Sequence, residues 1–372
     1  MVEAVENMVK RAKLTTPKLW IRRSGRLWRR NSVDDPPEGH TRSSILDLPE
    51  ECLVIVLKNL TAYEIANVAR VCKRFYQVSY NPTLWSCIDL SFEEFLSWFL
   101  PKVSFVDMDN YDWKEVITNA RRRMSFASFL VARKAALAEI RARGDLNIFR
   151  EGDMLIYLLN NCNVKNLKKI ELWLPGGYWD WEFTRCFQRV LRCLVRNCWN
   201  VLKSLRCEVD VSYTTAKLLG SLHNLEYLNL HFPLQDVLQP EALDVILSSL
   251  PNLKYFKITI QQQIYDEDFP GYVFKSDSLE TLDFGHTKQF WIQEMTLPKL
   301  HTINAESLHT GYYIERDLCL FDVVERGCPL IQTLNGYTSL LPGLHNFHLS
   351  ETQKRQLCFC ECSVHSLSRG YF

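Results

Sequence analysis

Long uninterrupted apolar runs are missing from this sequence, and none approaches the roughly twenty residues that a membrane-spanning helix needs. Its first residues, MVEAVENMVKRAKL, lack the apolar core of a secretory signal peptide. A net charge of +1 gives no overall preference for nucleic acid or for an acidic substrate. We therefore expect a chain without a membrane span, located in the cytoplasm, the nucleus or both.

Motifs for the commonest chemistries are also missing. There is no G-x-G-x-x-G, G-x-x-x-x-G-K-[ST], G-x-S-x-G or H-E-x-x-H pattern. The chain does contain thirteen cysteines, but they are scattered among apolar residues, which is typical of buried, reduced thiols in an intracellular protein. The final four residues lack the cysteine of a prenylation box. We predict no catalytic residue and no cofactor.

One cysteine cluster near the C-terminus raises the question of a metal site. Cys358, Cys360 and Cys362 alternate with other residues, and His365 follows. Zinc sites usually leave two residues between paired cysteines and draw a second pair from elsewhere in the chain. The spacing favours a strand or loop with reduced thiols, so we predict no metal.

What the sequence has is length and apolar residues. Its 372 residues and 47% hydrophobic content suffice for two domains and a large core. Residues 1–43 are polar and strongly basic, and they are expected to form a disordered arm. Such an arm either acts as an import signal or contacts anionic lipid or nucleic acid, or it is a solvated tail that does neither.

Residues 44–91 carry the most regular pattern. Leu48 and Pro49 suit the first turn of a helix, because proline needs no helical partner for its missing N–H. Thr61 and Glu64 predict a capping box at the start of a second helix, which Phe75 and Tyr76 would close. The two apolar stripes are Leu53, Val56, Leu57 and Leu60, then Ile65, Val68, Ala69 and Cys72. With Leu84 and Trp85, three short helices would carry more apolar surface than under roughly fifty residues can bury. Part of that surface should meet a partner.

This stretch resembles the F-box family. The resemblance is carried by the Leu-Pro start, the run Val71-Cys72-Lys73-Arg74-Phe75-Tyr76 and the ending Leu84-Trp85-Ser86-Cys87-Ile88-Asp89-Leu90, with apolar departures at Cys52, Leu57 and Phe75. It implies a helical trio that docks on a Skp-family adaptor and, through it, on a cullin-RING ubiquitin ligase. The adaptor-binding residues it implies are Leu48, Pro49, Leu53, Val56, Leu57, Leu60, Ile65 and Val68. The alternative is an ordinary three-helix packing unit.

Residues 92–150 are interpreted as a helical linker. From Tyr111 to Arg143 the composition is helical, with apolar residues on one side and arginines elsewhere. A basic amphipathic helix can bind membranes or calmodulin-like grooves, but packing against its own domain is favoured. The linker would then set the distance between the F-box and the rest of the chain.

An internal repeat occupies residues 151–345, followed by a tail at 346–372. The template L-x-x-L-x-L, with substitutes, recurs about seven times at irregular spacing near the 20 to 29 residues of a leucine-rich repeat. The template segments begin at Leu167, Leu202, Leu225, Leu253, Leu279, Leu300 and Ile331. Helical segments are expected at Trp181 to Asn197, Glu241 to Leu250 and Leu318 to Arg326. This region resembles the leucine-rich-repeat class, which implies an α/β solenoid with short parallel strands on the concave side and helices on the convex side.

In such a solenoid the residues between the apolar positions face the concave surface. That surface would mix both charge signs with several tyrosines, which suits a protein partner better than a phosphate backbone. Two aromatic loops, at residues 173–181 and 261–272, would either add to recognition or cap the core. The candidate substrate-binding residues are Trp173, Tyr178, Trp179, Arg206, Tyr227, His231, Tyr255 and Lys257.

The sequence thus predicts a non-catalytic substrate-recognition subunit of an SCF-type (Skp, cullin, F-box) E3 ubiquitin ligase. Its partners would be a Skp-family adaptor and an unidentified protein substrate, held close to a charged conjugating enzyme. One rival is an adaptor-binding scaffold that never assembles with a cullin. Another is a protein of nucleic-acid or lipid surfaces that uses the basic arm and the Arg121 to Arg143 segment.

Overall fold

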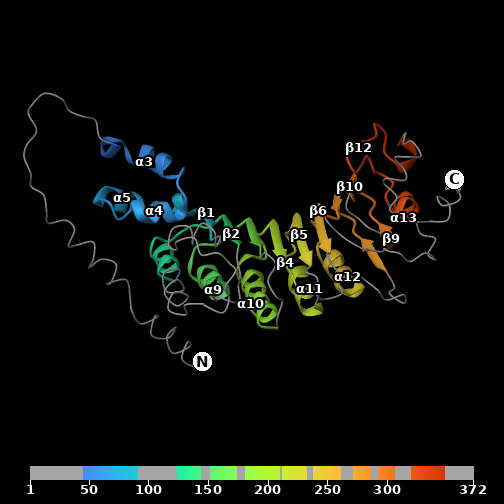
Figure 1. Cartoon of the computed structure of the whole chain (residues 1–372), viewed down its shortest axis with the longest axis horizontal. Coiled ribbons are helices and arrows are strands. Elements are labelled where there is room, and N and C mark those ends of the chain that lie inside the picture. Colours follow the sequence, from blue (N-terminus) through green and yellow to red (C-terminus); the bar gives the residue numbers. More distant parts are fainter. Residues whose placement is uncertain are drawn as a thin grey trace, which may run out of the picture. The chain divides into compact units, whose positions relative to one another are not determined.

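A computed structural model describes residues 45–90, 124–143, 151–173, 181–209, 212–232, 238–260, 271–285, 292–305 and 320–347. The chain divides into two compact units, Met1–Ala138 with Phe149–Val164, and Glu139–Ile148 with Lys165–Phe372. The fold is mixed α/β, with a helical region first and a sheet of parallel strands after it (Figure 1). We refer to the two parts as the helical unit and the sheet unit.

The helical unit is built from short elements. In order they are η1 (Ile45–Asp47), α3 (Glu50–Leu57), α4 (Ala62–Val68), α5 (Lys73–Val78), η2 (Pro82–Trp85), β1 (Cys87–Asp89), a helical segment at residues 124–132, and α9 (Glu151–Asn161). Its core contains four side chains that are each 0% exposed: Leu53, Trp85, Ile88 and Leu130. These residues come from both sides of the gap between residues 90 and 124, so the unit is not confined to residues 44–91.

Local signals fix where its helices begin. α3 begins directly after Leu48-Pro49, as predicted, although Pro49 is its N-cap and not a residue of the first turn. The capping box of α4 is confirmed: the Glu64 backbone N–H donates to Thr61 Oγ1 at 3.3 Å, and the Thr61 backbone N–H donates to Glu64 Oε2 at 2.8 Å. The expected end of that helix is wrong, because α4 stops at Val68. Cys72 caps a separate helix, α5, which carries Phe75 and Tyr76.

The predicted helix from residue 111 to 143 is also wrong at its C-terminal end. The helical segment stops before Lys134, whose φ of 54° places it in the left-handed region. The Ala135 N–H donates to Leu130 O and the Lys134 N–H to Val131 O, which is a Schellman ending. Residues 139–143 then form a strand of the sheet unit. Residues 1–43, 92–123 and 144–150 of the expected arm and linker lie outside the described residues.

The sheet unit is a row of parallel strands. They are β2 (Glu139–Arg143), β3 (Lys169–Trp173), β4 (Ser204–Glu208), β5 (Tyr227–Phe232), β6 (Tyr255–Ile260), β8 (Thr281–Asp283), β10 (Thr302–Asn304) and β11 (Thr333–Leu334), paired in that order. Each of the seven template segments contributes one strand, as predicted. The apolar template positions align across the row, as Ile170, Leu205, Leu228 and Phe256 do, and each of these four side chains is 0% exposed.

Helices line one side of this row (Figure 1). They are α10 (Trp181–Cys198), α11 (Tyr213–Gly220), α12 (Pro240–Ser249) and α13 (Leu320–Gly327). The three expected helical segments coincide with α10, α12 and α13, whereas α11 was not predicted. Between β6 and β10 the chain uses β7 (Tyr272–Lys275) and β9 (Ile292–Thr296), which pair in parallel with each other.

An antiparallel strand follows the last parallel one. β12 (Tyr337–Thr338) pairs with β11 through a turn at Asn335 and Gly336, whose φ values are 48° and 80°. Positive φ at both turn residues is the signature of a type I′ hairpin, which asparagine and glycine favour. No helix among the described residues is long and apolar enough to cross a membrane.

Candidate functional site

The helical unit exposes large apolar side chains at its surface. Val71 is 67% exposed and Ile55 65%, although aliphatic side chains of this size are usually buried. The adjacent Val56 is 39% exposed, and Leu48, just before α3, is 36% exposed. Ile45, in η1, adds a further exposed side chain. These five exposed apolar residues on one small unit are candidates for contact with a protein partner.

The eight predicted adaptor-binding residues divide between core and surface. Leu53, Leu57 and Ile65 are 0%, 2% and 1% exposed, so they belong to the core of the helical unit. Leu60 and Val68 are half-buried. Leu48, Pro49 and Val56 are exposed and available to a partner. Ile55 and Val71 belong to the same exposed class, and the prediction missed both.

Hydrogen bonds hold the start of α3 against α5. Arg74 Nη2 donates to the Leu48 backbone carbonyl at 2.5 Å, across 26 residues of sequence. A charged donor strengthens such a bond. Because Leu48 precedes the N-cap of α3, this bond fixes the chain where the exposed Leu48 and Pro49 lie.

A buried arginine ties α5 to the helical segment at residues 124–132. Arg133 is 5% exposed, and its Nε donates to Ser79 Oγ at 3.1 Å. Its guanidinium lies 3.5 Å from the Phe129 ring centroid, and within 5.0 Å of the ring centroids of Tyr76 and Tyr80. Burial lowers the pKa of Arg133, while the two tyrosines oppose that shift. Among the described residues, this cation is therefore held by aromatic rings and a hydroxyl and not by a carboxylate.

Trp85 completes the same contact. Its ring meets Phe129 edge to face at 5.4 Å between centroids, and its Nε1 donates to the Ser79 carbonyl at 2.9 Å. The helix predicted from Tyr111 to Arg143 would keep its arginines, Arg133 among them, off the apolar side. The ending at Lys134 turns it inward instead, and no glycine marks that ending in the sequence.

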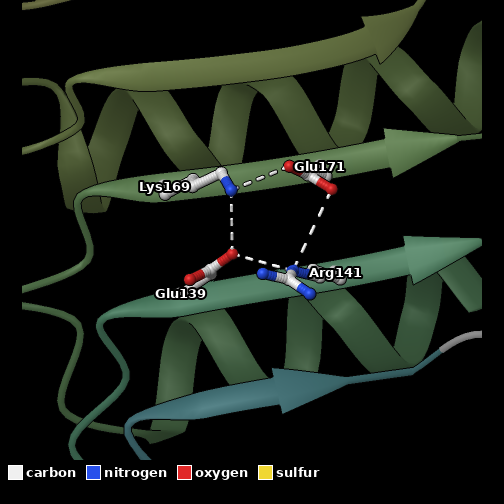
Figure 2. Close-up of polar contacts among 4 residues, drawn as sticks. All are labelled: Glu139, Arg141, Lys169 and Glu171. Atoms are coloured by element: carbon white, nitrogen blue, oxygen red, sulfur yellow. Dashed lines mark hydrogen bonds and ion pairs between the residues drawn. The ribbon is translucent and has the colours of Figure 1, made fainter.

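On the sheet unit, the face of the strands opposite the apolar core carries polar side chains. Figure 2 shows four of them, from β2 and β3, joined in a ring. Lys169 Nζ lies 3.0 Å from Glu139 Oε1 and 2.9 Å from Glu171 Oε1, and Arg141 Nε lies 2.8 Å from Glu139 Oε1 and 4.0 Å from Glu171 Oε2. Two cations and two anions leave this ion-pair ring without net charge.

The pKa values in the ring follow its geometry. Burial raises the pKa of Glu139, but hydrogen bonds from Lys169 and Arg141 outweigh it, so the pKa ends below its usual value. The hydrogen bond to Glu171 raises the pKa of Lys169 against the effect of burial. Glu139 and Lys169 are thus held in their charged forms near neutral pH.

On the same face, β5, β6 and β8 carry a cluster of aromatic and charged side chains. Tyr227 and Tyr255 stack at 4.4 Å between ring centroids with 6° between the planes. Asp283 Oδ2 accepts from the Tyr255 hydroxyl at 3.0 Å and from Lys257 Nζ at 2.9 Å, and its Oδ1 accepts from the Gly285 N–H at 2.7 Å. Burial and then the Asp283 charge raise the pKa of Tyr255, so this phenol remains a donor. Asp283, which is not among the predicted binding residues, orients two of them, Tyr255 and Lys257.

The structure brings five of the eight predicted substrate-binding residues onto adjacent strands. Arg206 and Asn229 are register partners, as are Glu208 and His231, and Asn229 is aligned with Lys257. His231 Nδ1 lies 3.8 Å from Glu208 Oε1, and that carboxylate is 2% exposed. For Trp173 only the backbone in β3 is described, whereas Tyr178 and Trp179 lie outside the described residues, as do 261–270 of the second aromatic loop.

Two polar-face residues were missed because β2 was missed. Glu139 and Arg141 align with Lys169 and Glu171 in the parallel register. A signal was present: Leu137, Ile140 and Ala142 fit the same template with an alanine in the last place. The helical composition of the preceding residues outweighed it.

The cysteines of the described ranges are free thiols. Burial raises the pKa of Cys162 to about 11, and it raises the pKa of Cys198 and of Cys328 to about 12. Thiols in this state are poor nucleophiles at neutral pH. Cys52 and Cys87 are exposed, contrary to the expectation that the cysteines are buried. The cluster at Cys358, Cys360 and Cys362 lies beyond the described residues.

Comparison with known proteins agrees with the geometry of the helical unit. A family model described as F-box-like matches residues 45–91, the stretch that contains η1 to β1 and the exposed apolar side chains. No curated protein matches the chain. Residues 45–91 therefore form an F-box-like domain, a type of domain that suggests binding of an Skp-type adaptor in an SCF-type complex.

Proposed function

We propose that this protein is a non-catalytic substrate-recognition subunit of an SCF-type E3 ubiquitin ligase. The F-box-like domain docks on the Skp adaptor, and a cullin-RING ligase assembles through that adaptor. The sheet unit is a leucine-rich-repeat solenoid whose polar strand face binds the protein to be ubiquitinated. The chain supplies proximity between substrate and conjugating enzyme, which raises their effective concentration.

The observation that carries this proposal is the exposed apolar surface of the F-box-like domain. Ile55, Val56 and Val71 are 65%, 39% and 67% exposed in a domain whose core is otherwise complete. Burying an aliphatic side chain contributes about 1.5–3 kcal/mol, so a partner that covers these residues gains substantial binding energy. The buried Leu53 and Leu57 support that surface from below.

The repeat reading rests on the strand register. Seven segments with one sequence template form parallel strands in which equivalent residues lie side by side, and α10, α11 and α12 return the chain on one side. Neighbouring strands of a solenoid are expected to stack in this way. The stacked Tyr227 and Tyr255, with Lys257 beside them, supply aromatic and charged groups that suit a protein partner.

The test is co-purification of the adaptor with a variant of the exposed surface. Replacing Ile55 and Val56 by aspartate places two charges where the partner would bury apolar side chains. Adaptor binding should fall at least about tenfold, measured by titration with purified adaptor. The matched control is Gln77→Asp on exposed α5, which adds the same kind of charge at a polar position. It should bind like the unmodified protein.

Adaptor binding that survives the double substitution would contradict the docking surface. Substitution of buried Leu57 by a charge is less informative, because it should unfold the domain itself. Recovery of a cullin with the adaptor, and substrate turnover that depends on it, separates a ligase subunit from a scaffold that stops at the adaptor.

A further inference from the structure

Helix α10 carries a stripe of arginines on its outer side. Arg185, Arg189, Arg192 and Arg196 follow one another at spacings of four, three and four residues, and all four are exposed. Residues at these spacings lie on one face of a helix. At about 1.5 Å of rise per residue the stripe extends over roughly 16 Å. The opposite face is apolar, and its buried residues are Phe187, Val190, Leu191, Leu194 and Cys198.

The arginine stripe has a single acidic residue near it on its own helix, three residues before Arg185. Glu182 is the only acidic residue in the α10 sequence, and it precedes all four arginines. Within the described part of the chain, no ion pair involves Arg185, Arg192 or Arg196. Like charges three and four residues apart destabilise a helix slightly. Arg189 has an interaction of its own, but pairing within the described part of the chain does not account for Arg185, Arg192 and Arg196 in this arrangement.

The neighbouring helices show that this charge is local. In α11 the exposed charged side chain is Lys217, whose Nζ lies 4.5 Å from the Tyr213 ring centroid. In α12 the exposed charges are acidic, at Glu241 and Asp244. The charge on the helix side of the sheet unit thus changes sign from α10 to α12. A uniformly solvated surface would mix both signs along each helix.

α10 is also held firmly in place. Gln188 Nε2 donates to Ser212 Oγ at 3.2 Å and to Thr215 Oγ1 at 3.3 Å, and Ser212 is the N-cap of α11. With its apolar face in the core, α10 presents the arginine stripe on a rigid support. Guanidinium groups suit such a task, because their planar donors pair with a carboxylate through two bonds.

We propose that the arginine stripe of α10 is a docking site for an acidic segment of a partner protein. A partner segment can place four carboxylates along the length of the stripe in two ways: on one face of a helix, or on alternate residues of an extended chain. This site lies on the helix side of the sheet unit, away from the strand face proposed to bind substrate, and it does not depend on adaptor docking.

The structure favours an acidic protein segment over other polyanions. Proteins that bind single-stranded nucleic acid combine a basic groove with exposed aromatic rings. On α10 the described aromatic side chain, Phe187, is buried, and Trp199 is exposed only beyond the end of the helix. A helix that reads duplex DNA must enter the major groove, which α11 packed alongside obstructs. Binding to a lipid surface would require exposed apolar residues between the arginines, and those described there are buried or half-buried.

The test measures binding of a fluorescent peptide of sixteen glutamates to the full chain by anisotropy. A variant with all four arginines replaced by glutamine should bind the peptide about 10- to 100-fold more weakly. Each exposed ion pair that is lost should lower the affinity by a factor of about 1.4 to 5. A variant with four lysines there should bind more tightly than the glutamine variant and more weakly than the unmodified protein, because an ammonium group keeps the charge but not the paired donors. Raising the salt from about 0.05 M to 0.5 M should weaken binding at least tenfold.

The matched control removes the same charge elsewhere in the sheet unit. Glutamine at the exposed Lys168, Lys203, Lys254 and Lys299 should change peptide binding by less than about threefold. Equal losses in the arginine and lysine variants would overturn the proposal, because binding would then follow net charge only. Oligouridylate or phosphatidylserine vesicles that bind tenfold tighter than the peptide, through the same arginines, would also overturn it and assign the stripe to nucleic acid or lipid.

Discussion

The two units use apolar residues in opposite ways. In the helical unit Ile55, Val56 and Val71 remain at the surface although the core beneath them is closed. In the sheet unit the apolar template positions are buried almost without exception, and the strand face exposes polar groups that largely pair with one another. An exposed apolar surface suits a partner that covers it permanently. A polar surface whose charges already pair with one another suits a partner that is recognised by specific polar contacts.

This difference has a physical cause. A short helical trio offers one side of each helix to its own core and has too little chain to cover the rest. A row of parallel strands is covered on one face by helices along its length, so burial is complete from strand to strand. We expect substitutions at the surface of the helical unit to change partner binding. In the sheet unit we expect a core substitution in one strand to affect the neighbouring strands.

The largest effects should come from the two cores, tested separately. Trp85→Ala removes a fully buried ring that contacts Phe129, and Phe256→Ala removes one between β5 and β8. Each should lower the free energy of unfolding of its own unit by about 3–5 kcal/mol. Hydrogen exchange followed by mass spectrometry reports the two units individually, which a single melting curve does not.

That experiment tests whether the helical unit and the sheet unit unfold independently. Trp85→Ala should abolish adaptor binding and leave protection in β4 to β6 unchanged, and Phe256→Ala should do the reverse. A loss of protection in both units from either substitution would show that they unfold together. The comparison drawn above would then fail.

A smaller effect is expected at the capping box of α4. Thr61→Ala removes the acceptor for the Glu64 N–H and should destabilise the helical unit by about 1 kcal/mol. Thr61→Ser retains the hydroxyl and is the matched control. Denaturant unfolding of the F-box-like domain in the full chain measures both. An equal loss in the serine variant would mean that the methyl group of Thr61, and not the cap, stabilises α4.

The smallest effect should come from the ion-pair ring. The folded pKa of Glu139 lies below its unfolded value, so its contribution is present above the unfolded pKa and is lost as the pH falls through the folded one. Solvent limits that contribution to about 0.2–1 kcal/mol. Glu139→Gln should lower stability at pH 7 and should differ less from the unmodified protein near pH 3, as seen in denaturant midpoints. Glu294→Gln, at a pair about half exposed, should be nearly silent.

Much of the fold was predictable because its signals are local. Thr61 and Glu64 specify a cap within four residues, and the repeated template places apolar side chains on one face of each strand whatever lies around it. β2 was missed because the template is weak there and follows a helical stretch. The ending at Lys134 was missed because a residue with a side chain occupies a position that glycine usually marks.

The candidate sites were less predictable. The sequence pattern placed Leu53, Val56 and Leu57 in one apolar stripe. In the structure α3 buries Leu53 and Leu57 but leaves Val56 exposed. Similarly, Tyr255 and Lys257 were recognised as exposed, but their common partner Asp283 comes from β8, which lies 26 residues beyond Lys257. Such pairings depend on strand order, which spacing alone does not contain.

By itself the sequence determined the F-box-like stretch, the helix starts and the strands of the repeat, because each depends on residues a few positions apart. Only the tertiary structure decided which leucines are core and which valines are surface. It also placed Arg133 inside an aromatic cage and joined Glu139, Arg141, Lys169 and Glu171 in one ring. Those outcomes depend on contacts between residues distant in the chain, and their energies arise only when the elements meet.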